Sequence, residues 1–193
     1  MARKRSLIGQ LLSSADRGRR TFSRDENGAV VIEFAFLAPI FFALVYAILE
    51  TSITFLAGQI LDSAVQDASR EIRTGSGDAA NVTLFRAEVC ERLYGMFDCA
   101  DLKIMVETIS TFASTTVTTP VNNDPNCDDP DTPDDYECWT ITEAYSAGAA
   151  SSIMLVQVFY RWPTLVNLGV DLGSLPGGGQ LLSAVRVFKN EPF

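Results

Sequence analysis

The chain has 193 residues, 47% of them apolar, and a formal net charge of -9, which together allow one modest domain with an extension. Bases concentrate near the amino terminus, since seven bases and three acids precede Gly28 and eight bases and twenty-one acids follow it. The acidic remainder argues against nucleic acid as a partner, and the absence of histidine excludes the usual histidine-activated serine and cysteine nucleophiles.

An apolar run follows the basic segment. It extends over twenty-one residues from Ala29 to Leu49, and a helix of that length covers about 30 Å, the thickness of a bilayer core. Because bases that flank a span stay in the cytoplasm, we expect residues 1–28 on the cytoplasmic side and the remainder beyond the membrane. A cleavable secretory signal is the alternative, but its site would follow the run, whereas Val45-Tyr46-Ala47 lies inside it.

The helical pattern continues beyond the apolar run. Apolar residues recur at intervals of three or four from Ile53 to Ile72, with polar residues between them. This period predicts one helix over 29–73 that leaves the bilayer and lays an apolar stripe on a globular head. Gly75 and Gly77 predict where the helix ends.

The head, residues 74–193, is predicted to be α+β. A second helix is expected from Asn81 to Tyr94, ended by Gly95. Three segments have the β-branched composition of strands, and they predict a small antiparallel sheet on which the helices pack. These segments are 102–109, 153–160 and 181–188.

Residues 113–150 are predicted to form a long acidic loop rich in Thr, Asp, Pro and Asn. Its carboxylates suit calcium, which binds several oxygen ligands, but their spacing differs from that of an EF-hand. We therefore favour a solvated loop without a metal, and we expect no cofactor. The calcium candidates are Asp128, Asp129, Asp131, Asp134 and Asp135.

All four cysteines follow the apolar run, on the side predicted to lie in an oxidising compartment. Three pairings are possible, and the shortest loops favour Cys90 with Cys99 and Cys127 with Cys138. A zinc site is the competing interpretation. The chain lacks both C-x-x-C spacing and histidine, which argues against zinc.

Two residues of the apolar run are unusual for a membrane span. Glu33 is its only charged residue, and an ionised carboxylate at the centre of a bilayer costs about 2.5–3.5 kcal/mol. It either has a functional partner or lies near the headgroups. Pro39 frees one helical carbonyl, so it either permits a kink or is a tolerated membrane proline.

The segment Gly28-Ala29-Val30-Val31-Ile32-Glu33-Phe34 resembles the processing motif of pilin-like proteins of the tight-adherence (Tad, or Flp) class of type IV pili. More narrowly, the chain resembles TadE-like pseudopilins. Pro39 in the span, Arg70-Glu71-Ile72-Arg73-Thr74-Gly75 and the terminal Phe188-Lys189-Asn190-Glu191-Pro192-Phe193 carry this resemblance, although an arginine is usual where Lys189 stands.

The resemblance implies that a prepilin peptidase cleaves after Gly28 and removes residues 1–28. The new α-amine at Ala29, cationic at neutral pH, could then pair with Glu33 of a neighbouring subunit. It further implies a minor pilin in the bacterial inner membrane, with its amino terminus cytoplasmic and its carboxyl terminus periplasmic, and possible incorporation into an extracellular pilus. Its partners would be other Tad pilins and pseudopilins, the inner-membrane assembly platform, the peptidase and lipid.

Two other classes of protein remain open at this point. One is a single-pass anchored periplasmic scaffold that is never processed. The other is a secreted hydrolase that uses carboxylates and is released near Ala47, although no pair of acids stands out as catalytic. We expect a peptidase substrate rather than an enzyme.

Overall fold

The computed structural model describes residues 26–75, 81–115, 117, 119–121, 139–164, 173, 175 and 179–192, with side chains from Gly28 onward. By its internal contacts the chain divides into two units, residues 1–48 and residues 49–193. The second unit, which adds the end of the long helix to the predicted head of residues 74–193, is called the head from here on.

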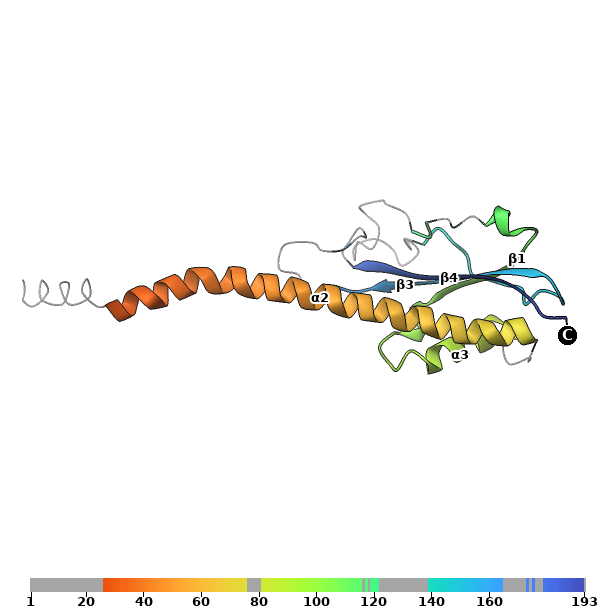
Figure 1. The fold of residues 1–193 in the computed structure, drawn as a ribbon, viewed down its shortest axis with the longest axis horizontal. Coiled ribbons are helices and arrows are strands. Elements are labelled where there is room, and N and C mark those ends of the chain that lie inside the picture. The colour runs from red at the N-terminus through yellow and green to blue at the C-terminus, as the bar shows by residue number, and fades with distance from the viewer. Residues whose placement is uncertain are drawn as a thin grey trace, which may run out of the picture. The chain divides into compact units, whose positions relative to one another are not determined.

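Helix α2, Glu26–Thr74, belongs to both units (Figure 1). The predicted helix over 29–73 is confirmed, with three more residues at its start and one at its end. Gly75 has φ 67°, a left-handed conformation that favours glycine, and its amide donates to the carbonyl of Ile72. The glycine stop is therefore the one expected from the sequence.

The part of α2 in the head buries one stripe of small and branched side chains. Their spacing of three and four residues places them on one side of the helix, where they join the hydrophobic core. Alanines at three positions let the helix approach the sheet closely. The stripe consists of Ala57, Leu61, Ala64, Val65, Ala68 and Ile72.

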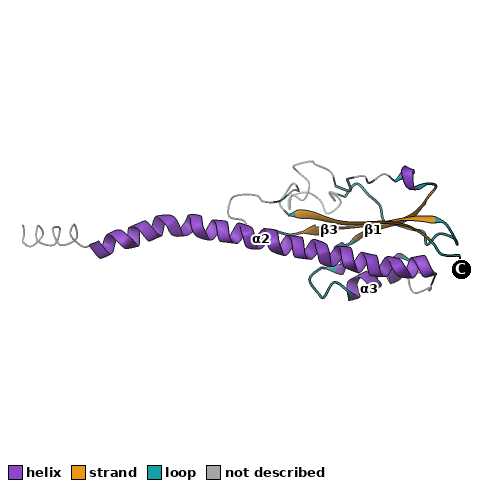
Figure 2. Ribbon diagram, in the orientation of Figure 1, coloured by secondary structure: helices purple, strands orange, loops and turns teal. Residues whose placement is uncertain are grey.

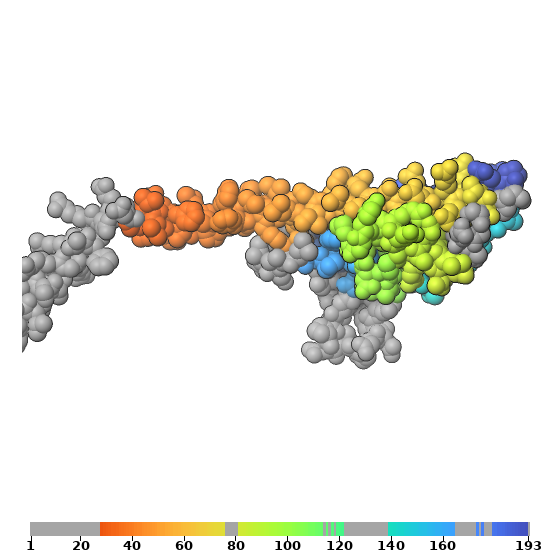
Figure 3. Space-filling view, turned by 90° about the horizontal axis from the view of Figure 1, so that it is seen from below, coloured from red at the N-terminus to blue at the C-terminus, as the bar shows by residue number. Residues whose placement is uncertain are grey.

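Helix α3, Val82–Glu91, lies beside this part of α2 (Figure 3). It begins where the side chain of Asn81 accepts from the amide of Leu84 at 3.0 Å. It ends three residues before the predicted Tyr94, because the chain turns through positive φ angles of 52° at Tyr94 and 71° at Gly95. The Cys90–Cys99 disulfide is confirmed, whereas Cys127 and Cys138 lie outside the described residues.

The sheet has four strands in the order β2-β1-β3-β4. Strands β1, Lys103–Ile109, and β4, Gln180–Lys189, both pair antiparallel with β3, Ile153–Trp162, as expected. The prediction of a purely antiparallel sheet is wrong in one detail, because β2, Ala144–Tyr145, pairs parallel with β1. The fold class, α+β with a long apolar amino-terminal helix, is confirmed.

Strand β2 lies within 113–150, which was predicted to be loop throughout. Two residues are too few to show a strand period, so the sequence carries no signal for it. A carboxylate anchors this segment, because Glu143 accepts from the backbone amide of Ile104 at 3.2 Å and forms an ion pair with Arg86 on α3. Short 3-10 turns lie at Cys99–Asp101 and Phe112–Ser114.

The head portion of α2 and α3 cover one face of the sheet (Figure 2). Ile104, Val106, Val156 and Val158 belong to the same core cluster as the buried stripe of α2. Strand β3 is also buried on its opposite face, where Leu155 and Phe159 lie. A central strand buried on both faces explains why its sequence is an almost continuous apolar run.

Candidate processing and assembly segment

Gly28 lies inside α2, close to its start. A Cβ added at this position would have no heavy atom within 4 Å, and its φ is not in the left-handed range where glycine is favoured. Glycine inside a helix is about 1 kcal/mol less favourable than alanine. Neither backbone geometry nor packing of the described residues therefore requires glycine here.

Glu33 is exposed on α2, and none of the ion pairs among the described residues involves it. Ala29 precedes it by four residues, about one helical turn or roughly 6 Å along the axis. Phe34, the last residue of the predicted processing motif, is 65% exposed. The motif thus presents its side chains on the open surface of a helix.

The apolar side chains of residues 28–48 are exposed as a group. This helix is long and apolar enough to cross a membrane, by length and composition. Pro39 lies inside it and does not end it. The large side chains that are more than half exposed are Val30, Val31, Ile32, Phe34, Phe36, Leu37, Ile40, Phe41, Phe42, Leu44 and Ile48.

So much uncovered apolar surface is unfavourable in water, at about 25 cal/mol per Å². It requires an apolar environment, such as lipid or neighbouring helices. This property is consistent with membrane anchoring through one helix.

The end of α2 and the carboxyl terminus of the chain form a polar clasp. The amide of Glu191 donates to the carbonyl of Arg73 at 3.0 Å, and their side chains form an ion pair at 3.5 Å. Asn190 is 3% exposed, and its side-chain amide donates to the carbonyls of Ala147 and Ala149 at 3.1 and 3.2 Å. The clasp therefore joins three segments that are far apart in the sequence.

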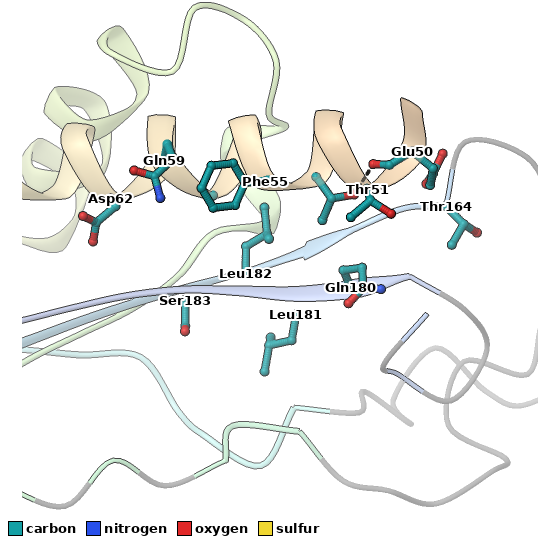
Figure 4. A pocket seen from close by; sticks show the side chains of 12 residues that line it. Glu50, Thr51, Phe55, Gln59, Asp62, Thr164, Gln180, Leu181, Leu182 and Ser183 are labelled. Atoms are coloured by element: carbon teal, nitrogen blue, oxygen red, sulfur yellow. Dashed lines mark hydrogen bonds between the residues drawn. The ribbon is translucent and has the colours of Figure 1, made fainter. Parts of the chain in front are cut away.

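An open groove lies between α2 and β4, which is one of the two edge strands of the sheet. An ion pair between Asp62 and Arg186 crosses it. The cavity on one side, about 540 Å³, is lined by residues of both elements, among them Glu50, Phe55 and Gln180 (Figure 4). The other cavity, about 670 Å³, adjoins the clasp at Arg73 and Glu191.

A comparison with protein families finds a match to the family described as TadE-like protein over residues 28–70. This segment is therefore similar to TadE-like proteins. The match begins at Gly28 and covers most of α2, while α3 and the sheet lie outside it. No curated protein and no solved structure matches the chain.

The TadE-like match confirms the family resemblance predicted from the sequence and suggests a protein associated with the Tad pilus. Two of the sequence motifs that carried this resemblance, 70–75 and 188–193, meet in the clasp through Arg73 and Glu191. The sequence did not predict this contact. The only sign of this contact in the sequence was that both motifs occur in one chain.

Among the described residues of the head, Glu88, Arg92 and Tyr145 have shifted pKa values. Arg92 lowers the pKa of Glu88, chiefly by donating a hydrogen bond to its carboxylate. Their ion pair joins a residue of α3 to the residue that caps the end of this helix. Burial raises the pKa of Tyr145 to about 12. Tyr145 is thus neutral at physiological pH and packs its ring near Phe85.

Within the part of the chain that the structure describes, no three His, Cys, Asp or Glu side chains are grouped as metal ligands. The predicted calcium candidates, Asp128 to Asp135, lie outside the described residues, so that prediction is not tested.

Proposed function

We propose that the chain is a minor pilin or pseudopilin of the Tad pilus system. A prepilin peptidase cleaves it after Gly28, and its amino-terminal helix carries it into a pilus or into the complex that initiates one. The protein is a substrate of that peptidase and has no catalytic role of its own.

One observation above all supports this proposal. The TadE-like match begins at Gly28, the residue where cleavage is expected. It covers a helix whose first half is exposed and apolar and whose second half buries one side in the head. Such a division suits a subunit that is anchored by one half of a helix and folded around the other. The unprocessed periplasmic scaffold shares the anchor, but it leaves the glycine at position 28 without a purpose.

The amino-terminal residue of the membrane-bound protein tests processing. We expect the chain to begin at Ala29 in cells that contain the peptidase and to keep residues 1–28 in cells that lack it, as measured by intact mass. Retention of the leader in both kinds of cell would leave the unprocessed scaffold as the function.

Two glycines of α2 provide a matched pair of variants. Gly28→Ala adds a Cβ with no heavy atom within 4 Å, and Gly58→Ala adds one that meets only a methyl carbon of Leu182 at 3.9 Å. Both variants should fold normally. We expect Gly28→Ala, or a bulkier residue there, to block or slow maturation, and Gly58→Ala to mature like the wild type.

A further inference from the structure

The head exposes most of its uncovered large apolar side chains at one end. From residue 50 onward, seven large apolar side chains are exposed among the described residues, and four of these belong to α2 and to the turn after α3. These four are Phe55, Leu56, Tyr94 and Met96, which are 69%, 52%, 82% and 37% exposed. Phe112 and Val117 follow β1 in the chain, and Leu84 lies on α3.

Contacts place the turn with Tyr94 at the end of the head where α2 arrives from the apolar segment. Phe97, in the same turn, stacks on Trp162 with ring centroids 5.3 Å apart. Trp162 pairs with Gln180 across the sheet, and Gln180 lines the cavity of Figure 4 together with Glu50 and Phe55. The apolar surface of residues 28–48 is thus followed, along α2, by further exposed apolar groups of the head.

The backbone of the turn that exposes Tyr94 has an energetically unfavourable conformation. Tyr94 and Gly95 both have positive φ angles, 52° and 71°. A left-handed conformation costs a residue with a side chain about 1–2 kcal/mol, and asparagine or glycine would tolerate it better. The side chain of Tyr94 is 82% exposed, so packing within the head does not offset this cost.

The depth of these groups along α2 matches the surface of a bilayer. Glu33 and Phe55 are separated by twenty-two residues, or about 33 Å of helix, close to the roughly 30 Å of a hydrocarbon core. With Glu33 at the cytoplasmic border, its desolvation is avoided and Phe55 reaches the opposite border. Glu50 lies between these two residues on α2, but its side chain would not be exposed to lipid, because it is only 6% exposed and thus covered by protein.

We propose that Phe55, Leu56, Tyr94 and Met96 form a lipid-contact surface, by which the head of the stored subunit rests on the outer headgroup layer of the membrane. Tyrosine is enriched at this layer because its ring is apolar and its hydroxyl is polar. Exposed acids near the turn, Glu91 and Asp98, make zwitterionic headgroups the fitting chemistry. This inference depends on membrane anchoring within the proposed function, and not on processing or assembly.

Fluorescence quenching by brominated lipid tests the proposal in the full chain. Trp139 and Trp162 are replaced by Phe, and single tryptophans are introduced as Phe41→Trp in the span, Tyr94→Trp at the turn, or Phe112→Trp. Phe112 is a matched control, because it is 57% exposed and follows β1, whose last residue pairs with Ile153 at the end of β3 opposite Trp162. Each protein is reconstituted in phosphatidylcholine vesicles with and without bromine on the acyl chains.

We expect the loss of fluorescence to be largest at residue 41, intermediate at residue 94 and absent at residue 112. Met96→Trp provides a second reporter on the same turn, and an intact Cys90–Cys99 bond verifies that the turn has formed. If residue 41 is quenched while residues 94 and 96 behave like residue 112, the lipid-contact surface is overturned and anchoring stands.

The remaining outcomes also decide the proposal. No quenching at residue 41 would overturn membrane anchoring, and the lipid-contact surface with it. If emission from residue 94 is insensitive to bromine but changes with the number of chains per vesicle, the occupant of the surface is a neighbouring copy, and lipid is excluded.

Discussion

The two halves of α2 differ in what surrounds them, although both are helical. Residues 28–48 expose nearly all of their large apolar side chains, whereas the stripe from Ala57 to Ile72 is at most 4% exposed. The first half is apolar on every side and the second on one side only. The difference shows that one continuous helix can meet two kinds of surroundings, an apolar environment outside the head for one half and the core of the head for the other.

The largest effect is expected from the charge in the first half. Glu33→Gln would leave the amine at Ala29 of a neighbouring subunit without its counter-charge, and an unpaired buried charge costs about 3–5 kcal/mol. We therefore expect cleavage to proceed and incorporation into sheared fibres to be lost, as measured by immunoblot of the fibre fraction. Normal incorporation would remove the assembly role of Glu33, and an unchanged head stability serves as the control.

Equivalent truncations in the two halves should have very different consequences. Leu61 is fully buried, so Leu61→Ala should lower the free energy of unfolding of the head by about 2–5 kcal/mol. Leu37 is 66% exposed, and Leu37→Ala should change it by less than about 0.5 kcal/mol. Denaturant titration in detergent, followed by tryptophan fluorescence, measures both. Similar losses would contradict the separation of the two halves.

The disulfide should matter for the head and not for the anchor. Cys90→Ser with Cys99→Ser opens a loop with a sequence separation of 9 residues, and removing such a link costs about 3 kcal/mol. We expect faster proteolysis of the head and unchanged recovery of the chain in the membrane fraction. Loss of the chain from membranes would show that anchoring depends on a folded head.

Variants of the clasp measure how much its contacts at the end of α2 stabilise the head. Asn190→Ala removes two hydrogen bonds at a buried position, so the free energy of unfolding should fall by about 1–3 kcal/mol. Glu191→Gln, at the next residue, is the matched control variant. Its ion pair with Arg73 joins side chains that are 52% and 55% exposed, and its loss should cost less than about 0.5 kcal/mol. A larger effect at Glu191 would reverse this ranking.

The smallest effect concerns the pH dependence of the head. Because Arg92 lowers the pKa of Glu88 below its ordinary value of 4.5, the pair stabilises the fold above that pH and loses its contribution as the pH falls through the lowered pKa. Wild type and Glu88→Gln should differ by less than about 0.5 kcal/mol at neutral pH and should converge in acid. A difference that grows as the pH falls would contradict this assignment.

The sequence by itself determined the local structure of this protein. The sequence predicted α2, three strands and one disulfide from four local signals. These are the apolar run with its continuing intervals of three or four, the β-branched segments, the glycine at 75 and the short spacing of Cys90 and Cys99. Each of these signals comes from residues that are close together in the sequence, where local propensity and periodicity decide the structure. The residues of the expected processing motif, Gly28 to Phe34, are adjacent as well, and their role in processing stays a prediction from the family resemblance.

Tertiary structure alone decided what joins distant segments. The parallel pairing of β2 depends on Glu143 meeting Arg86 and Ile104, and the clasp depends on Asn190 and Glu191 meeting residues more than thirty-five positions away. The exposure of Tyr94 likewise follows from a turn that the core cluster at Phe97 and Trp162 holds in place. Hydrogen bonds and packing between remote residues leave no period in a single sequence, so only the folded chain reveals them.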